Sequence, residues 1–274
     1  MDFITKKILI LVKTYPSLSK KYKELVCTAG MDENGVWYRL YPLPFRMLTK
    51  DKRYEKYRWI EAKLLKNTED CRVESYKVID YKNIKLLEKI DSNDWGRKSK
   101  VVLKKQECID LNELITRSKE QNISLAVFKP TKILDFIWEK DDREYSKDKL
   151  DAIEAEKNQL NLFANDDENM KDFTVIPKLP YKFSYVFEDV NGKKSTLMIE
   201  DWEVGAAYWN FLRNYKDEET TLNKLREKFF DDFVKKKNLY FFLGTTKQYH
   251  GWAKNPFIII GIFPLPLAVQ NSLF

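Results

Sequence analysis

The sequence predicts an α+β fold, because strand-like and helix-like segments occur in separate blocks rather than in strict alternation. Short apolar and aromatic runs separated by turn signals fill residues 1–80, which is typical of a small β-barrel or a curled antiparallel sheet. Residues 177–274 combine a hairpin, two amphipathic segments and two apolar runs, which favours an antiparallel sheet with helices. A charged helical middle joins these two parts.

The first strands are expected at 8–13, 25–29, 36–41, 57–65 and 74–79. Asn34-Gly35 lies between the second and third of them, and this dipeptide is a strong hairpin signal because a type I′ turn needs two residues with positive φ. Pro42 and Pro44 end the third strand, since proline has no backbone N–H for a strand ladder. Residues 1–80 are therefore predicted to form one β-rich domain.

The middle region, 81–140, is expected to be helical and then extended. Apolar residues recur at helical spacing in two stripes, which are Ile84, Leu87 and Ile90, and Leu111, Leu114 and Ile115. Residues 125–138 look extended, with an interruption at Pro130. Residues 141–176 are densely charged and include an acidic run at 165–169, so they are predicted to be a linker.

The C-terminal region, 177–274, should begin with a hairpin whose strands, 181–187 and 195–199, flank Asn191-Gly192. Asp201 can cap a helix over 202–214, because its carboxylate can accept hydrogen bonds from the first free backbone N–H groups. A second helix is expected to start at Thr220 or Thr221. Two apolar strands, 239–243 and 257–263, complete the predicted α+β domain.

Composition limits the class of protein. With 43% hydrophobic residues, 8 Gly and 9 Pro, the chain can bury a sizeable core and is neither fibrous nor disordered. Its net charge of +7 is typical of proteins that bind nucleic acid, although a lysine-rich proteome would give the same surplus. The 3 cysteines form no Cys-x-x-Cys pair, and no apolar run is long enough to span a membrane. We therefore expect a cytoplasmic protein with no membrane partner.

One short motif occurs twice, as Gln159-Leu160-Asn161-Leu162-Phe163 and as Gln270-Asn271-Ser272-Leu273-Phe274. Both copies have the form Gln-x-(Asn/Ser)-Leu-Phe. This pattern resembles the pentapeptide with which bacterial DNA polymerases and repair proteins bind the replicative sliding clamp. The resemblance covers these two segments only, and it implies a ring-shaped partner with more than one equivalent pocket.

The residue types in both pentapeptides suit docking. The side-chain amides of Gln159 and Gln270 both donate and accept hydrogen bonds, so they can fix register at the rim of a pocket. The apolar anchors of the two copies are Leu160, Leu162, Phe163, Leu273 and Phe274. An alternative is that Leu160 and Phe163 close the apolar face of a helix over 146–163, with the second copy packed on the body.

Basic and aromatic residues alternate near the predicted hairpin, and we consider them candidates for nucleic-acid binding. They are Lys13, Trp37, Arg39, Tyr41 and Arg46. Trp37, Arg39 and Tyr41 should share one face of a strand, where rings can stack on bases and the guanidinium can contact phosphate. The alternative is a half-buried sheet face with one arginine that extends to solvent, because strands are rich in aromatic residues anyway.

Glu61 and Lys63 form a Glu-x-Lys pair on a predicted strand, which resembles the PD-(D/E)xK nucleases. That resemblance implies that the two side chains hold a metal ion and its attacking water, and Mg²⁺ would then be needed. The acidic partner that should precede the pair is represented only by Asp51, in a lysine-rich loop. His250 has no accompanying nucleophile signature, and no glycine-rich phosphate loop occurs.

These observations favour a nucleic-acid-associated accessory protein of DNA replication, repair, or conflict with phage or mobile elements. It would dock on the sliding clamp, with DNA or RNA as a further partner and no cofactor. Two alternatives stay open: a metal-dependent nuclease that uses Glu61 and Lys63, and a non-enzymatic nucleic-acid-binding barrel whose pentapeptides only pack against the body.

Overall fold

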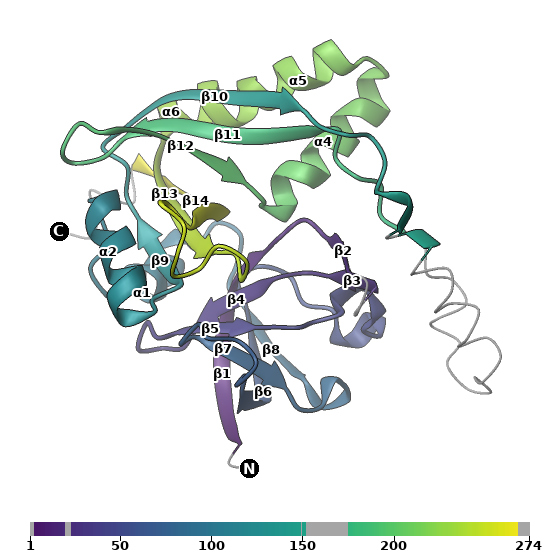
Figure 1. Ribbon diagram of the computed structural model, residues 1–274, viewed down its shortest axis with the longest axis vertical. Coiled ribbons are helices and arrows are strands. Elements are labelled where there is room, and N and C mark those ends of the chain that lie inside the picture. Colours follow the sequence, from purple (N-terminus) through teal and green to yellow (C-terminus); the bar gives the residue numbers. More distant parts are fainter. Residues whose placement is uncertain (1–2, 20–22, 149, 152–174, 268–274) are drawn as a thin grey trace.

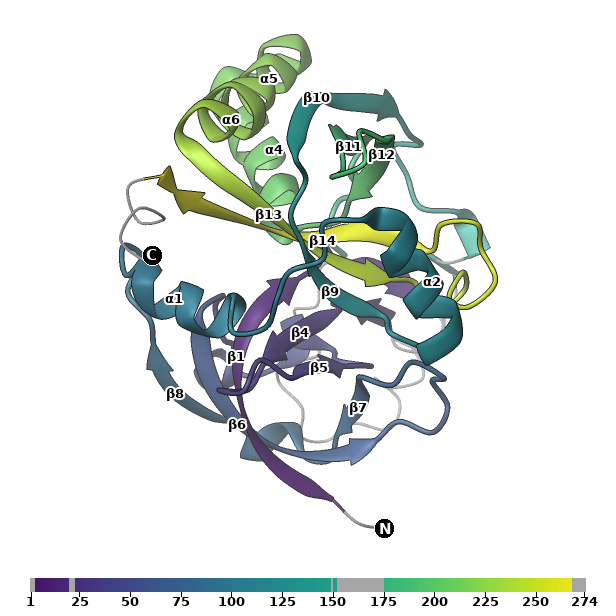
Figure 2. The ribbon, with the colours of Figure 1, turned by 90° about the vertical axis from the view of Figure 1, so that its left-hand side faces the viewer.

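The computed structural model describes residues 3–19, 23–148, 150–151 and 175–267 and has three layers (Figure 1). A β-barrel forms the first layer and a 6-stranded sheet forms the second. Helices α4 (Trp202–Tyr215), α5 (Glu218–Arg226) and α6 (Phe233–Lys236) cover the face of that sheet that points away from the barrel (Figure 2). The predicted α+β class, with an N-terminal barrel and a C-terminal sheet with helices, is confirmed.

The barrel contains, in spatial order, β1 (Ile4–Lys13), β4 (Thr28–Met31), β5 (Trp37–Leu40), β7 (Ser75–Val78) and β6 (Arg58–Lys66). It closes because β1 pairs with β4 on one side and with β6 on the other. The barrel is mixed rather than purely antiparallel, since β5 and β7 run parallel. Strand β8 (Lys85–Lys89) extends the sheet beyond β6, while β2 (Ser17–Ser19) and β3 (Lys23–Leu25) form a separate ribbon.

Strand β1 is buried on both faces, and its residues from Ile8 to Val12 are each 0% exposed. Because side chains alternate along a strand, Ile8 and Ile10 point into the barrel while Leu9 and Leu11 pack against the C-terminal sheet. One strand therefore contributes to two hydrophobic cores. This double burial explains the continuous apolar run that the sequence shows at this position.

The C-terminal sheet has the order β10 (Lys132–Lys140), β11 (Tyr181–Glu188), β12 (Lys194–Ile199), β14 (Phe257–Pro266), β13 (Lys237–Thr245) and β9 (Leu125–Phe128). Its neighbours are antiparallel except β12 and β14, which are parallel. One face packs under the helices through Phe136, Tyr185 and Phe241. The opposite face packs on the barrel through Tyr240, Phe242 and Phe263.

Aspartates begin four of the described helices, as the dipole and the free N–H groups of a first turn favour. They are Asp94 before α1 (Trp95–Val102), Asp110 before α2 (Leu111–Gln121), Asp201 before α4 and Asp217 before α5. Short helical turns occur at η1 (Phe45–Met47), η2 (Lys50–Lys52) and η3 (Tyr81–Asn83), and a π-type segment, η5 (Glu227–Asp232), joins α5 to α6.

Several local predictions are confirmed. Both Asn-Gly turns connect antiparallel strands, and Gly35 and Gly192 have φ values of 70° and 71°. Asp201 caps α4, because its carboxylate accepts a hydrogen bond from Glu203 N.

Two local predictions are wrong. Residues 85–89 form strand β8 and not a helix, since Ile84 and Leu86, two positions apart, both pack on the barrel core. The second C-terminal helix starts after Asp217 rather than at Thr220 or Thr221, because the Asp217 carboxylate accepts from Thr220 N.

A buried ion pair joins the layers. Lys56, between η2 and β6 of the barrel, places its Nζ 2.8 Å from Asp201 Oδ2. The same carboxylate caps α4 and accepts a hydrogen bond from Ile262 N of β14 at 2.9 Å. Lys56 and Asp201 are 7% and 2% exposed. One carboxylate thus connects the barrel, the C-terminal sheet and the helical layer.

Within the described part of the chain, no helix is both long and apolar enough to cross a membrane.

We predict that Asp201→Ala lowers the free energy of unfolding by about 3–5 kcal/mol, because Lys56 would stay buried with only the exposed Glu203 carboxylate, 3.4 Å away, as its counter-charge. Chemical denaturation of the full chain measures this loss. Asp217→Ala is the matched control, since Asp217 caps α5 from an exposed position and its loss should cost much less. Equal losses in the two variants would contradict the central role of Asp201.

Candidate functional site

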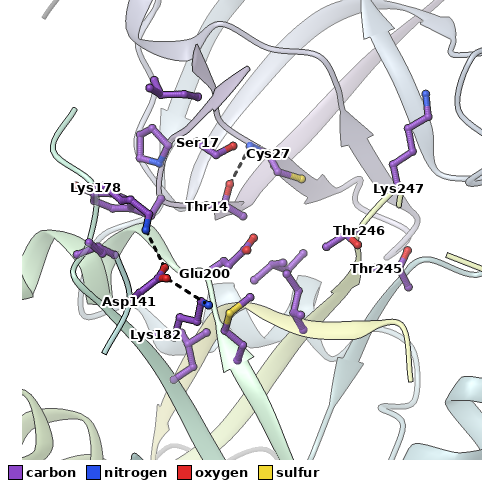
Figure 3. A pocket seen from close by; sticks show the side chains of 18 of the residues that line it. Thr14, Ser17, Cys27, Asp141, Lys178, Lys182, Glu200, Thr245, Thr246 and Lys247 are labelled. Atoms are coloured by element: carbon purple, nitrogen blue, oxygen red, sulfur yellow. Dashed lines mark hydrogen bonds and ion pairs between the residues drawn. The ribbon is translucent and has the colours of Figure 1, made fainter. Parts of the chain in front are cut away.

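A pocket of about 450 Å³ opens between the barrel and the C-terminal sheet (Figure 3). Thr14 to Leu18, which follow β1, form one part of its wall. Arg39 on β5 and Arg72, in the loop before β7, contribute from the barrel. Residues at the ends of β12 and β13 contribute from the second sheet. Functional sites often lie at such junctions of two layers.

Two hydrogen bonds between the layers involve residues that line the pocket. Tyr15 N donates to Glu200 O at 2.8 Å, which ties the end of β1 to the segment after β12. Arg72 Nη1 donates to Thr245 O at 2.7 Å, which ties the barrel to the end of β13. All four residues line the pocket, which therefore forms where the two layers meet.

Arg72 is held in place by a bidentate ion pair. Its Nε and Nη2 donate to the two carboxylate oxygens of Asp70 at 2.8 and 2.6 Å, and Ser75 Oγ donates to the same carboxylate at 2.7 Å. Burial alone would raise the pKa of Asp70, but the hydrogen bonds and charge of Arg72, with help from Ser75, lower it to about 2. The pair therefore stays ionised while Arg72 reaches the second sheet.

Arg39 is a buried cation at the base of the pocket, with only 1% of its surface exposed. Its Nη1 donates to Cys27 Sγ at 3.1 Å and its Nη2 to Ser124 O at 3.0 Å. Its Nε is buried and has no hydrogen-bond partner among the described residues. Burial lowers the pKa of this guanidinium from its ordinary value.

Glu200 brings a carboxylate to the same pocket and faces the space between Thr14 and Thr246 (Figure 3). No hydrogen bond or ion pair of this carboxylate is found within the described part of the chain. Burial raises its pKa above the ordinary value. A half-buried acid without a partner among the described residues is a candidate for ligand recognition.

Lysines lie on opposite sides of the pocket (Figure 3). Lys178 and Lys182 both pair with Asp141, at 3.1 and 3.4 Å. Lys247 Nζ instead donates to the backbone oxygen of Glu69 at 2.7 Å. Because that acceptor is uncharged, Lys247 keeps its full positive charge for a ligand.

Four tyrosines give the pocket flat apolar surface, and they are Tyr15, Tyr41, Tyr145 and Tyr181. The Tyr15 hydroxyl is already used, since it donates to Pro177 O and accepts from Trp209 Nε1, both at 2.8 Å. The Tyr145 hydroxyl makes no hydrogen bond to any described residue, and burial raises its pKa to about 12. The pocket thus combines aromatic faces with charged groups of both signs.

The predicted nucleic-acid face is not an open surface, because the C-terminal sheet covers β5. Trp37 packs edge-on against Phe242 with ring centroids 5.7 Å apart, and Arg39 is the buried cation described above. The alternative, in which the arginine extends to solvent, is wrong for the same reason. Of the predicted residues, Arg39 and Tyr41 line the pocket.

The other two predicted residues have structural partners. Lys13 Nζ lies 4.5 Å from the Phe45 ring centroid and 4.9 Å from that of Trp202. Burial, with repulsion from Lys56, lowers the pKa of Lys13 to about 8. Arg46 pairs with the buried Glu24 at 2.6 Å.

Glu61 and Lys63 lie two positions apart on β6 and face outward, as the strand period requires. Glu61 pairs with Lys85 of β8 at 2.8 Å, and Lys63 lies over the Phe3 ring at 5.2 Å. Asp51 lies on η2. Among the described residues, no group of three or more His, Cys, Asp or Glu side chains could hold a metal ion.

The pentapeptides 159–163 and 270–274 lie outside the described residues. The first falls between β10 and β11 in the chain, and the second follows β14.

Sequence reasoning missed an aromatic loop between β13 and β14, at residues 246–256. Tyr249 and Trp252 are 44% and 68% exposed, with ring centroids 5.5 Å apart. Lys247 and Lys254 are exposed in the same loop. His250 is buried beneath it, and its Nδ1 lies 3.0 Å from Thr245 Oγ1. The sequence feature that could have revealed this loop is a pair of aromatic residues, Tyr249 and Trp252, in a polar loop between two strands.

Two family models match the chain. Residues 104–274 match the model described as "Domain of unknown function (DUF8757)", and residues 4–104 match the one described as "Domain of unknown function (DUF8758)". The two matches meet after α1. The DUF8758 match covers the barrel with β8 and α1, and the DUF8757 match covers the C-terminal sheet with α2 and the outer helices. No curated protein matches the chain.

We predict that the stability lost in Asp70→Asn depends on pH. The pKa of Asp70 is about 2 in the folded state and 3.8 as the unperturbed value, so its carboxylate stabilises the fold above pH 3.8 and ceases to do so as pH falls towards 2. The difference in unfolding free energy between wild type and variant should shrink by about 2 kcal/mol over that range. Urea denaturation of wild type and Asp70→Asn at pH values above and below this range tests the prediction, and Asp142→Asn is an exposed control. A difference in unfolding free energy that does not change with pH would contradict it.

Proposed function

The chain belongs to the DUF8757 family, and we propose that it is a nucleic-acid-associated accessory protein that docks on the bacterial sliding clamp through Gln159–Phe163 and Gln270–Phe274. It would act in the cytoplasm, in DNA replication, repair, or conflict with phage or mobile elements. The observation that supports this proposal is the repeated Gln-x-(Asn/Ser)-Leu-Phe motif.

The two segments lie far apart in the chain, one between β10 and β11 and the other after β14. Two peptides on one chain can engage two equivalent pockets of a ring. The second contact would then form at a high effective concentration, provided that the chain between the peptides spans the pockets. A protein attached in this way is kept beside the DNA that the clamp encircles.

The aromatic loop 246–256 is our candidate for contact with nucleic acid. Tyr249 and Trp252 present exposed rings on which unpaired bases can stack, and Lys247 and Lys254 can neutralise phosphates. The net charge of +7 also favours a polyanionic partner. This loop replaces the hairpin face around Trp37 and Arg39, which the C-terminal sheet covers.

A nuclease that uses Glu61 and Lys63 finds no comparable support. The Glu61 carboxylate is engaged by Lys85, and no further metal-binding acid joins it among the described residues. The plain nucleic-acid-binding barrel differs from our proposal only in lacking the clamp, so clamp binding decides between them.

We predict that the full chain binds the purified sliding clamp and that changing Gln159, Phe163, Gln270 and Phe274 together to Ala abolishes this binding. Each single-copy variant should weaken binding at least tenfold if both peptides engage one ring. Surface plasmon resonance with immobilised clamp measures both effects.

The matched control for that experiment is Gln106→Ala with Phe3→Ala, which removes the same residue types from exposed positions elsewhere. Its affinity for the clamp should equal that of the wild type. Undiminished affinity in the four-residue variant, or no affinity in the wild type, would overturn docking through the pentapeptides.

We further predict that Trp252→Ala weakens binding of single-stranded DNA or RNA by about 1–3 kcal/mol, because one stacked base is lost. Fluorescence anisotropy with a labelled oligonucleotide at several salt concentrations measures this. Tyr215→Ala is the control, since Tyr215 is 45% exposed at the end of α4, outside the loop. Equal effects of the two substitutions would exclude the loop as the contact.

A further inference from the structure

The pocket between the barrel and the C-terminal sheet has the size and composition of a nucleotide site. Its volume of about 450 Å³ lies in the range of small-molecule pockets. Four tyrosines line it, together with five cationic and two acidic residues. Aromatic faces suit a planar base, and an excess of cations suits a phosphate.

Two buried polar atoms at this pocket, Arg39 Nε and Thr246 Oγ1, have no hydrogen-bond partner within the described residues. The half-buried Glu200 carboxylate and Tyr145 hydroxyl also make no hydrogen bond to a described residue. Buried polar groups are nearly always hydrogen-bonded, so two such atoms beside further free groups at one cavity indicate a ligand that would complete them. Both donors and acceptors are free, which excludes a purely apolar occupant.

Acidic and basic side chains lie in different parts of the pocket. Glu200 faces the middle of the pocket and Thr246 lies on one side of it, followed by Lys247, whose exposed side chain extends outward to Glu69 O (Figure 3). The lysines opposite, Lys178 and Lys182, share the single carboxylate of Asp141, which offsets part of their charge and would itself repel an anion. The side of Lys247 and Thr246 is thus the better position for an anion, and the middle is the position for a group that donates hydrogen bonds.

We propose that this pocket binds a guanine nucleotide unit, with the base donating to the Glu200 carboxylate and the phosphate held by Lys247 and Thr246. A carboxylate only accepts hydrogen bonds, and its two oxygens can accept two adjacent ones. Guanine presents two adjacent donors, N1–H and the 2-amino group, on its Watson–Crick edge. Adenine, cytosine and uracil each offer one donor group there, so Glu200 selects against them.

Simpler occupants leave part of the pocket unexplained. Inorganic phosphate would use the lysines but would be repelled by Glu200 and would leave the tyrosines without a role. A free nucleoside would use Glu200 and the rings but not Lys247. The assignment rests on the nucleic-acid half of the proposed function, because one unpaired guanine of a strand that crosses the neighbouring loop could enter the pocket.

Isothermal titration calorimetry of the full chain with GMP, AMP, CMP, UMP, guanosine and inorganic phosphate tests this assignment. We expect saturable GMP binding, at least tenfold tighter than that of the other three nucleotides. Glu200→Gln should weaken GMP and guanosine at least tenfold each. Lys247→Met should weaken GMP but leave guanosine unchanged.

Two variants serve as matched controls. Glu120→Gln on α2 and Lys132→Met on β10 remove the same charges from exposed positions outside the pocket, and they should bind GMP as the wild type does. Thermal unfolding of each variant verifies the fold. No saturable binding of GMP at millimolar concentration, equal binding of all four nucleotides, or equal GMP affinity in wild type and Glu200→Gln would overturn the guanine site.

The experiments distinguish failure of the guanine site from failure of the proposed accessory function. If GMP does not bind but the clamp and oligonucleotides do, the guanine site is wrong and the accessory function stands. If GMP binds with the expected pattern while clamp and oligonucleotide binding are absent, the guanine site stands and the proposed accessory function falls.

Discussion

The buried ion pair between Lys56 and Asp201 is the interaction on which the layered structure depends. Burying two charges costs several kcal/mol of solvation, and this cost is offset only where the geometry is good and the remaining oxygen positions are satisfied. Asp201 meets this condition because Lys56 Nζ, Glu203 N and Ile262 N all donate to it. The pair therefore fixes where the barrel, α4 and β14 meet, which non-directional apolar packing alone would not do.

The pocket follows from this arrangement. Along β1 the two layers meet through apolar side chains, but farther from it they are connected by cations of the barrel that donate to backbone oxygens of the sheet. Arg39 reaches Ser124 O beside β9, and Arg72 reaches Thr245 O at the end of β13. Charged groups that are buried between two layers need space and polar partners. A cavity with hydrogen-bonding groups that have no partner among the described residues therefore remains beside the two arginines. The same polar contacts that join the layers thus define the site.

Much of the fold could be predicted from local sequence, because the responsible forces act within a few residues. The Asn-Gly turns need positive φ, and Asp201 caps the helix that follows it. The error at β8 arose because Ile84, Leu87 and Ile90 fit a helical period as well as a strand at a barrel edge. Local periodicity cannot separate these cases when the segment is short.

The candidate site was less predictable, because it depends on contacts between distant parts of the chain. Arg39 contacts Ser124, 85 positions away, and Lys56 contacts Asp201, 145 positions away. The sequence identified Trp37, Arg39 and Tyr41 as a group, but it could not show that a second sheet would cover them. The sequence shows Glu200 only as one of several neighbouring carboxylates, and it could not place this side chain at a pocket that forms where two distant layers meet.

Our central claim is that the two pentapeptides attach this layered body to a sliding clamp. Hydrogen–deuterium exchange of the full chain, with and without the clamp, tests it most directly because it reports on each segment without any substitution. The account predicts slower exchange at 159–163 and 270–274 when the clamp is present, with the barrel strands unchanged. Unchanged exchange in both segments at saturating clamp, or protection confined to the barrel, would contradict it.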